Sequence, residues 1–490
     1  MKLITKELLL EEIAKNYPFE PTEEQNRAIT MISEFASCDK DRSMFLLKGY
    51  AGTGKTTLIG ALVRALKRFS YRVILMAPTG RSAKIFSLYS STNAYTIHKK
   101  IYRQKSILES DNFQLDRNIY EDTLFLIDEA SMISNEGLSG SMFGTGRLLD
   151  DLISYVYSGK SCRMILLGDS AQLPPIGEIE SPALNADILS SYGLSVTEFN
   201  LKNVMRQMNR SGILYNATAL RQLIQAAEEG KDVGTYSFKF VLKDFPDVKQ
   251  ISGSELVESL NKCYSSDGIG ETMVLCRSNK RAIVYNNGIR NAILDREDEL
   301  NSGDYLMIVK NNYFWTERVL KESNAESAQH VPSFIANGDI ALVKRVIKRH
   351  ELYGFSFCDV TIVFPDYEDF EIDVTVLLDT LHSEAPALKS EDSDRLFYNV
   401  MEDYDDITSK KEKMEKLREN SYFNALQVKY AYAVTCHKSQ GGQWSNIFID
   451  QGYLPDDKQD LGYCRWLYTA LTRAKKTVYL VNWPEDRITK

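Results

Sequence analysis

The chain has 490 residues, of which 43% are hydrophobic, 11% aromatic and 26% charged, and its formal net charge at pH 7 is −8. This length allows about two to four domains, and the composition is that of a globular protein with a sizeable core. No run approaches the ~20 consecutive apolar residues of a membrane helix, and the first residues, MKLITK, lead into an acidic amphipathic run rather than a signal-peptide core. The negative charge excludes a global basic field, so any nucleic-acid track must be a local stripe.

The seven cysteines are scattered along the chain without a Cys-x-x-Cys pair. This spacing argues against a zinc site or a disulfide framework and is typical of a reducing compartment. We therefore expect a cytoplasmic protein without membrane spans.

Apolar runs alternate with helical patterns in the first two-fifths of the chain. Short unbroken runs at residues 44–47, 73–76, 124–127 and 164–167 are typical of strands buried on both faces of a parallel sheet. Helix-like segments such as residues 57–69 separate them. This alternation indicates an open doubly wound α/β domain.

A second set of apolar runs predicts a second α/β domain, with strands at residues 273–276, 431–434, 447–449 and 478–481. The first and second of these strands are separated by a long segment of different composition. Three β-rich runs between residues 340 and 376 are followed by an acidic stretch and a charged helix-like segment, which we interpret as an inserted β domain with a linker. The predicted boundaries are 1–203 for the first domain, 204–338 with 427–490 for the second, and 339–426 for the insertion.

The strongest chemical signal is the run GYAGTGKT at residues 49–56, which lies between a predicted strand and a predicted helix. It matches the phosphate-loop pattern Gly-x-x-x-x-Gly-Lys-Ser/Thr at every fixed position. Its glycines let backbone N–H groups turn toward phosphates, and the helix N-terminus adds positive potential. We expect Lys55 to reach the β- and γ-phosphates of ATP and the Thr56 hydroxyl to ligate Mg²⁺. The predicted ATP-binding residues here are Gly49, Ala51, Gly52, Thr53, Gly54, Lys55, Thr56 and Thr57.

Two adjacent carboxylates, Asp128 and Glu129, follow the predicted strand 124–127. Such a pair is by itself most often a solvated strand end. Downstream of a phosphate loop, it lies at the carboxyl edge of the sheet beside that loop. Asp128 can then hold Mg²⁺ while Glu129 polarises the attacking water, which is the division of roles that hydrolysis needs.

The run LLGDSAQLPP at residues 166–175, taken with the two motifs above, resembles the motif set of superfamily 1 helicases, and the resemblance extends over most of the chain. It implies that Gln172 senses the γ-phosphate. The run PTEEQ at 21–25 is similar to the adenine-reading segment, which implies a base contact for Gln25. The run VMRQ at 204–207 implies that Arg206 reaches the γ-phosphate at the domain cleft.

Two motifs near the C-terminus complete the resemblance. The run YAVTCHKSQG at 432–441 is similar to the fifth motif of the RecD/Dda branch and places Gly441 in the ATP site. The run YTALTRA at 468–474 resembles the sixth motif, whose arginine, here Arg473, acts as a finger worth ~10³–10⁵ in rate. Because Arg473 belongs to the second α/β domain, its contact is expected only when the cleft closes.

DNA contacts are implied by the fifth motif and by two earlier runs, APTGRSAK at 77–84 and TIHK at 96–99. Hydroxyls, backbone N–H groups and a few cations would position a strand without reading its sequence. Taken alone, His98 and His437 would more often be partly buried structural residues. The predicted contacts are Pro78, Thr79, Arg81, Lys84, Thr96, His98, Lys99, Thr435, His437 and Lys438.

The family places a short wedge hairpin after the TIHK motif, here at about residues 102–122. Phe113, between polar Asn112 and Gln114, is the candidate tip. A base stacked on it would contribute ~1–3 kcal/mol. The alternative is that Phe113 is a minor core residue.

The resemblance implies an α/β fold with two tandem RecA-like P-loop domains, a wedge hairpin in the first and a small β-barrel insertion in the second. It implies an ATP-dependent motor, with ATP and Mg²⁺ as cofactors, that moves along single-stranded DNA and unwinds fork or tailed duplex. The 5′→3′ direction is implied by the RecD/Dda resemblance alone. One chain carries both halves of the ATP site, so a monomer suffices, and replication and repair proteins are candidate partners.

Two other classes of protein stay open. One is a DNA-stimulated ATPase or translocase subunit of a recombination or repair complex that does not itself unwind. The other is a P-loop enzyme without motor function, such as a small-molecule kinase. Two features depart from the family pattern: Gln443 stands where many members carry Glu, and the loop at residues 135–147 is long.

Overall fold

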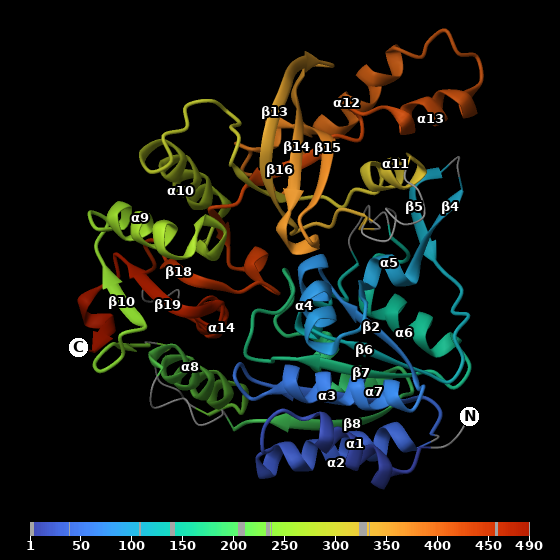
Figure 1. Ribbon diagram of the computed structural model, residues 1–490, viewed down its shortest axis with the longest axis vertical. Helices are drawn as coiled ribbons and strands as arrows, with labels where there is room; N and C mark the ends of the chain where they lie inside the picture. Colours follow the sequence, from blue (N-terminus) through green and yellow to red (C-terminus); the bar gives the residue numbers. More distant parts are fainter. Residues whose placement is uncertain are drawn as a thin grey trace.

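The computed structural model describes residues 4–38, 40–106, 109–137, 143–203, 211–231, 236, 238–322, 331–332, 334–455 and 459–489, without the side chains of 104–106 and 109–112. Two parallel sheets lie side by side, and a closed barrel sits above them (Figure 1). Among the described residues, no helix is long and apolar enough to cross a membrane.

The first sheet has six parallel strands in the order β3-β2-β6-β7-β1-β8. Each predicted strand of this half of the chain lies within one of them, so the prediction of a doubly wound domain is confirmed. The bounds are β1 Ser43–Gly49, β2 Arg72–Ala77, β3 Ala94–Thr96, β6 Thr123–Ile127, β7 Arg163–Gly168 and β8 Ser195–Leu201.

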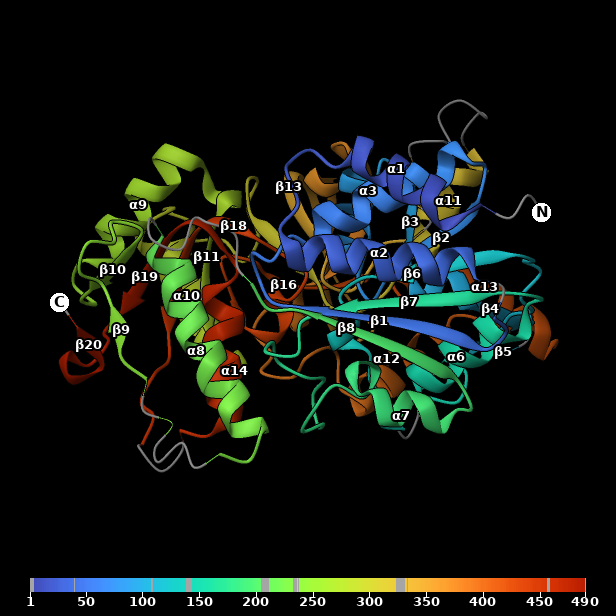
Figure 2. The same cartoon turned by 90° about the horizontal axis from the view of Figure 1, so that it is seen from below.

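Alternate side chains of these strands point to opposite faces, and each face is covered by helices. Phe45 and Leu47 pack with one group of helices, whereas Met44 and Leu46 pack with the other. The first group comprises α1 Lys6–Asn16, α2 Glu23–Ser37, α3 Lys55–Arg68 and α4 Gly80–Ser90. The second comprises α5 Ile97–Ile101, α6 Leu148–Ser158 and α7 Ala186–Ser191 (Figure 2).

The second sheet has five parallel strands in the order β10-β19-β18-β11-β17. Its strands are β10 Val248–Ile251, β11 Thr272–Cys276, β17 Ala433–Thr435, β18 Trp444–Asp450 and β19 Ala474–Val481. Helices α9 Leu256–Asp267 and α10 Asn279–Ala292 cover one face, and α8 Gly212–Glu228 and α14 Leu461–Leu471 cover the other. A short pair, β9 Phe240–Val241 and β20 Ile488–Thr489, lies beside them.

The insertion forms a closed barrel, but its strands do not all lie within the predicted range 339–426. The five strands are β12 Tyr305–Ile308, β13 Ile340–Leu352, β14 Phe355–Phe364, β15 Phe370–Leu377 and β16 Leu426–Tyr430. β12 closes the barrel by pairing with β13 and β16. Only the second half of the predicted strand 431–434 forms a strand, because the chain leaves the barrel at Tyr430 and enters the second sheet at Ala433.

The acidic stretch expected to be a linker forms helix α12, Ser390–Glu402. Its Leu396 and Val400 pack against Phe355 and Phe357 of the barrel, which explains why so charged a segment is ordered. The charged helix-like segment that follows is α13, Lys410–Glu419, as predicted. A further helix, α11 Phe314–Glu322, lies between barrel strands in the chain.

The predicted wedge region forms a two-stranded antiparallel hairpin of β4 Tyr102–Ser106 and β5 Glu109–Leu115. It extends from the first sheet beside α5 and reaches toward α11 (Figure 1).

Candidate active site and nucleic-acid interface

The predicted phosphate loop connects β1 to α3, which begins at Lys55. Gly52 and Gly54 adopt φ values of 79° and 86°, in the left-handed region that favours glycine. The Lys55 ammonium donates to the carbonyl oxygens of Gly49 and Tyr50, the latter at 3.0 Å. The loop therefore folds around its lysine, with Thr56 exposed and Thr57 half-buried on the first turn of α3.

Gln25 lies beneath this loop with only 2% of its surface exposed. Its Oε1 accepts from the Thr22 N–H at 2.9 Å, in a capping box that begins α2. Its Nε2 donates to the Thr53 carbonyl oxygen at 2.9 Å. In this state the amide of Gln25 is hydrogen-bonded to the protein backbone and holds the loop. To contact the edge of a base, Gln25 must break one of these hydrogen bonds and form one with the base.

The two carboxylates follow β6 directly, and both are half-buried. Asp128 accepts hydrogen bonds from the Tyr89 hydroxyl and, at 2.9 Å, from the Glu129 N–H. Burial first, and then the charge of the neighbouring Asp128, raise the pKa of Glu129 to about 7 against the opposing charges of Arg473 and Lys55. Glu129 is thus a carboxyl group that changes its charge near neutral pH, as a general base requires.

Helix α14 belongs to the second sheet and contacts the loops of the first. The Tyr468 hydroxyl accepts from the Ala51 N–H at 2.9 Å and donates to Asp169 at 2.7 Å. The Thr469 hydroxyl accepts from the Leu173 N–H at 2.9 Å. The run at 49–56, the run at 166–175 and the run at 468–474 therefore meet in one place.

Gln172 also lies at this junction and is 7% exposed. Its Oε1 has no hydrogen-bond partner among the described residues. A buried polar atom without a partner costs free energy, and such atoms are concentrated where a ligand binds.

Arg473 is 3% exposed, and its guanidinium donates to the carbonyl oxygens of Thr469 and Gly442 and to the Thr472 hydroxyl, at 3.1 to 3.3 Å. It is close enough to Glu129 to lower the pKa of that carboxyl. Arg206, the other predicted arginine of the cleft, lies outside the described residues.

The two domains approach closely around Gly441, another predicted residue of the ATP site. Gly441 has a φ of 76°, and a Cβ atom on it would lie 2.1 Å from the Ser82 Oγ. Gln443, the first departure from the family pattern, is exposed two residues later. The long loop at residues 135–147 is described only in part, because residues 138–142 lie outside the described residues.

Two cations predicted to contact DNA, Arg81 and Lys84, lie on α4 and are engaged by the barrel. The Arg81 guanidinium lies 4.3 Å from the centroid of the Trp444 ring and 3.7 Å from the Asp366 carboxylate. Lys84 donates to the Pro365 carbonyl oxygen at 3.3 Å. Both barrel contacts come from one turn, Pro365–Tyr367, which lies over the N-terminal half of α4. Pro78 and Thr79 precede this helix, and the Thr79 hydroxyl caps it.

Asp339, at the start of the barrel, is 1% exposed and lies under the same turn. It accepts from the Tyr367 hydroxyl at 2.9 Å and from the Ala336 N–H at 2.7 Å. Burial raises its pKa to about 7. A Cβ atom on Gly80 would lie 2.7 Å from the Asp339 carboxylate, so α4 and the barrel are in direct contact.

The TIHK motif forms the end of β3 and helix α5, with Thr96 capping the helix. The His98 ring packs against Phe143 and Tyr102 with centroids 5.0 and 5.8 Å away, and burial lowers its pKa to about 4. Lys99 lies on the other side of the helix, over the Tyr95 ring.

Phe113 is not at the tip of the hairpin, as predicted, but within strand β5. The strands end at Ser106 and begin again at Glu109, so the turn lies several residues away. The Phe113 ring stacks on Phe143 at 4.8 Å and contacts Tyr313 at 5.4 Å. This packing bears out the alternative of a minor core residue, because the alternation of side chains along β5 turns Phe113 toward α5 and α11 rather than outward.

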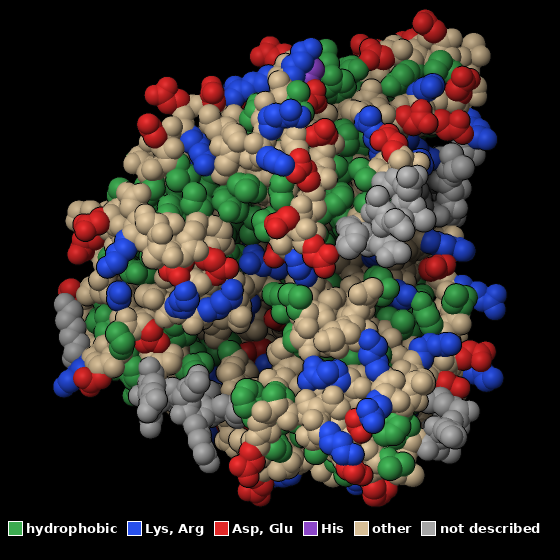
Figure 3. All heavy atoms as spheres, in the orientation of Figure 1, with side chains coloured by type: hydrophobic (Ala, Val, Ile, Leu, Met, Phe, Trp, Pro, Cys, Tyr) green, Lys and Arg blue, Asp and Glu red, His purple; other side chains and the backbone are tan. Residues whose placement is uncertain are grey.

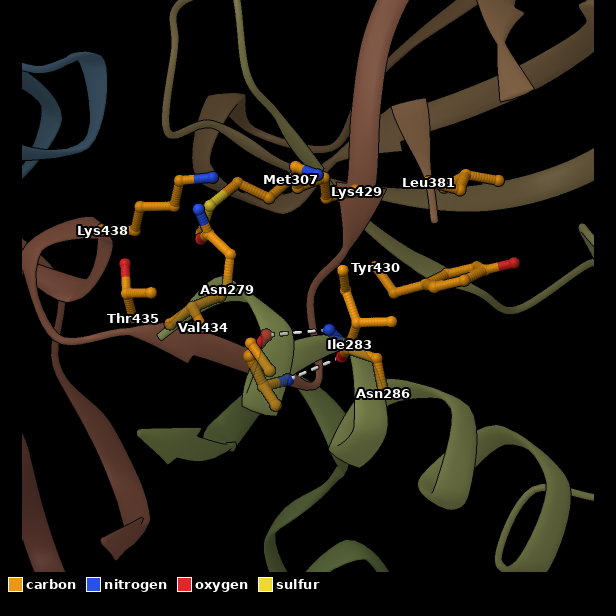
Figure 4. Close-up of a pocket in the computed structure, with 12 residues that line it drawn as sticks. Asn279, Ile283, Asn286, Met307, Leu381, Lys429, Tyr430, Val434, Thr435 and Lys438 are labelled. Carbon is orange, nitrogen blue, oxygen red and sulfur yellow. Dashed lines mark hydrogen bonds between the residues drawn. The ribbon is translucent and has the colours of Figure 1, made fainter. Parts of the chain in front are cut away.

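Thr435, His437 and Lys438 lie at the end of β17 and in the helical turn His437–Ser439. Thr435 and Lys438 line a pocket between the second sheet and the barrel, together with Asn279 and Lys429 (Figure 4). Burial, and then the charge of Lys438, lower the pKa of Lys429 to about 8.

Sequence patterns did not reveal several of these residues. Tyr468 lies inside the sixth motif, but the motif predicts no contact for it. No sequence motif marks the other four residues, which are Tyr89, Trp444, Asp366 and Lys429. They reach the site through contacts between distant parts of the chain.

Two family models and several known proteins are similar to this chain. Residues 21–236 match a family model described as an AAA domain, and residues 430–481 match one described as a UvrD-like helicase C-terminal domain. The ATP-dependent DNA helicase dda of Enterobacteria phage T4 is 23% identical, with 94% of this chain and 99% of its own covered. The RecBCD enzyme subunit RecD of Buchnera aphidicola is 23% identical, with 89% and 69% covered.

An uncharacterized protein of Methanocaldococcus jannaschii is 23% identical over 94% of this chain, which spans only 38% of that protein's length. Among solved structures, Pif1 helicase from Bacteroides in complex with ADP-AlF3 and ssDNA has a TM-score of 0.46 at 14% identity, with 96% of this chain and 95% of that chain covered. With the runs at 49–56, 166–175 and 468–474 meeting at one interface and both family models matched in order, these similarities support a superfamily 1 helicase of the RecD/Dda type.

Proposed function

We propose that the protein is an ATP-driven motor that moves along single-stranded DNA and unwinds duplex DNA. The observation that carries the proposal is the contact of α14 with both nucleotide loops, through Tyr468 to Ala51 and through Thr469 to Leu173. A site shared by two α/β domains changes shape when its ligand changes, so the nucleotide state can move one domain relative to the other.

Apart from Arg206, which lies outside the described residues, the residues with proposed roles in hydrolysis lie at or beside this junction. The Thr56 hydroxyl and the Asp128 carboxylate are oxygen ligands of the kind that Mg²⁺ prefers, and that ion would neutralise phosphate charge. Glu129 would take the proton from the attacking water, and Lys55 would bind the β- and γ-phosphates. Gln172 would sense the γ-phosphate, while Arg473 and Arg206 would stabilise the charge that develops on it.

The proposed DNA track crosses both domains beneath the barrel. Thr79, Arg81 and Lys84 on the first domain and Thr435, His437 and Lys438 on the second offer hydroxyls and cations for phosphates, with Thr96 and His98 beside α5. In this proposal the domains comprise residues 1–203, residues 204–338 with 427–490, and the insertion 339–426, to which β12 contributes a strand.

The direction of movement, 5′→3′, is proposed on the likeness of the run at 432–441 to the RecD/Dda motif. A monomer suffices for the mechanism, because one chain contributes both sides of the junction. RecD is a subunit of a larger enzyme, so the alternative of an ATPase or translocase without independent unwinding is retained.

Unwinding of duplexes that carry either a 5′ or a 3′ single-stranded tail tests activity and direction together. We expect ATP-dependent strand separation of the 5′-tailed duplex and little of the 3′-tailed one. The Lys55→Ala variant serves as the control without hydrolysis. Strand separation only from the 3′ tail would refute the direction, and DNA-stimulated hydrolysis without separation of either substrate would favour the translocase alternative.

A further inference from the structure

A surface groove of about 450 Å³ lies beside the base of the hairpin, on the face of the first sheet that α6 covers. Its walls come from four segments of the chain: β3 with α5, the first residues of β4, residues 116–120 that follow β5, and Tyr155 of α6. We call it the basic groove. Of the residues that line it, only Lys99 is among the predicted DNA contacts.

Cations dominate the basic groove. Lys99, Lys100, Arg103 and Arg117 line it, against a single carboxylate, Asp116. The chain as a whole carries a net charge of −8, so this concentration of positive charge runs against the average of the protein. Lys and Arg side chains gather along the corresponding edge of the molecule, beside α5 and the hairpin (Figure 3).

The cations repel one another and are only partly neutralised. Burial lowers the pKa of Lys99, and the adjacent charge of Lys100 lowers it further. Asp116 lies 3.3 Å from Arg103 in an exposed ion pair, which leaves the positive charge in excess. A bound anion would reduce the repulsion between these cations. Several cations in one groove are complementary to a ligand with several negative charges.

The aromatic rings of the groove are already covered. The Lys100 ammonium lies 4.9 Å from the centroid of Tyr95 and 4.7 Å from that of Tyr120, and the Lys99 ammonium lies 5.2 Å from Tyr95. These contacts hold the ammonium groups in place against Tyr95 and Tyr120. The groove therefore presents a cluster of positioned cations to which phosphates can bind.

Helix α5 separates the groove from the proposed single-strand track. Its His98 packs on Phe143 toward the hairpin and α11, whereas Lys99 and Lys100 point to the opposite side, over Tyr95. A strand that contacts Thr79, Arg81 and Thr96 would lie at the N-terminal ends of α4 and α5. The groove is thus adjacent to the place where the hairpin would divide a duplex, but outside the path of the strand on which the motor moves.

We propose that the basic groove binds the phosphate backbone of the duplex arm ahead of the hairpin. This inference rests on the proposed function and adds a second DNA site to it. Binding there would hold the duplex against the hairpin while α4 and the fifth motif pull one strand, so that force acts on the junction rather than displacing the whole DNA.

The test compares two variants with the same change in net charge. The groove variant is Arg103→Glu with Arg117→Glu, at exposed positions in the groove. The matched control is Lys249→Glu with Lys262→Glu, at exposed positions on β10 and α9 of the second sheet. A third variant, Arg103→Gln with Arg117→Gln, removes the charges without reversing them and checks that folding is intact.

Binding is measured with oligothymidine and with a duplex that carries a 5′ tail, over a range of salt concentrations. For the groove variant we expect the Kd for the tailed duplex to rise about tenfold, and the slope of log K against log salt to fall by about 2, since each lost phosphate contact on duplex removes about 0.9. Affinity for oligothymidine and the ATP hydrolysis that it stimulates should be unchanged. The glutamine variant should show a smaller loss in the same direction, and the control should behave as the unmodified protein.

Three results would overturn the inference. Unchanged affinity for the tailed duplex would show that the groove does not bind it. A loss seen only with a fork that carries a second tail would assign the groove to the displaced strand, and an equal loss with oligothymidine would make it part of the single-strand track. Failure of the proposed function is recognised separately, as the absence of oligothymidine-stimulated hydrolysis by the unmodified protein.

Discussion

The hydroxyl of Tyr468 accepts a hydrogen bond from the backbone N–H of Ala51 at 2.9 Å and joins the second α/β domain to the phosphate loop of the first. The same hydroxyl donates to Asp169 at 2.7 Å, so one atom connects the runs at 49–56, 166–175 and 468–474. Because the ring is buried, this link is shielded from water and is sensitive to small movements of the domains.

Replacing Tyr468 with Phe removes the hydroxyl and keeps the ring. Losing a buried hydrogen bond to a charged group costs about 1.5–3 kcal/mol. If the lost hydrogen bonds stabilise mainly the state in which the cleft between the two domains is closed, kcat for DNA-stimulated ATP hydrolysis should drop about tenfold or more. The melting temperature should change little. Tyr463→Phe is the matched control, since Tyr463 is a buried tyrosine of the same helix whose hydroxyl donates to Gln451, away from the loops. Unchanged turnover in Tyr468→Phe would remove this link from the mechanism.

The pKa of about 7 for Glu129 predicts the pH dependence of hydrolysis. A general base must be deprotonated, so kcat/KM for ATP should rise with pH and level off above about 7. The measurement is steady-state hydrolysis at saturating oligothymidine from pH 5.5 to 9. Asp339 also has a pKa of about 7, so Asp339→Asn is the control that separates the two carboxyl groups. If the pH dependence disappears in Asp339→Asn while the rate survives, Glu129 is not the group observed.

Arg473→Ala should leave ATP binding near normal and reduce turnover about 10³-fold, because a finger acts on charge that develops during the reaction. Binding is measured with a fluorescent ATP analogue, and turnover with saturating DNA. Arg473→Lys keeps the charge and tests whether the planar guanidinium is needed. Lys475→Ala removes an exposed cation two residues away and should have no effect. If DNA-stimulated turnover survives in Arg473→Ala, closure of the cleft around this arginine is not the rate-determining event.

Asp366 of the barrel lies 3.7 Å from Arg81, a cation of the proposed DNA track. A carboxylate there competes with a DNA phosphate for Arg81, so Asp366→Asn should tighten oligothymidine binding by about threefold to fivefold, in line with the ~1 kcal/mol upper range of exposed ion pairs. The control is Asp369→Asn, an exposed position beyond the same turn whose φ of 56° asparagine accepts readily. Binding is measured by fluorescence anisotropy at low salt. Equal affinities for the unmodified protein and Asp366→Asn would mean that the barrel turn leaves Arg81 available to DNA.

Much of the fold was predictable because its determinants are local. A strand such as β6, with five buried residues, is apolar throughout when helices cover both faces of its sheet, and this is visible in a short window. The barrel was predicted without its strand β12, because four residues do not reveal which sheet they will join. Phe113 was placed at a tip from its polar neighbours, whereas its actual position depends on Phe143 and Tyr313, which are distant in the chain.

The residues of the proposed ATP site are predictable from their order and spacing. A phosphate loop needs glycines, a lysine and a hydroxyl at fixed spacing, and the carboxylates must follow a strand, so Lys55, Thr56, Asp128 and Glu129 can be named from residue order alone. The contacts that couple these groups could not be predicted in this way. The link from Tyr468 to Ala51 and the stacking of Arg81 on Trp444 join residues hundreds of positions apart, and such contacts depend on how whole domains pack rather than on any local pattern.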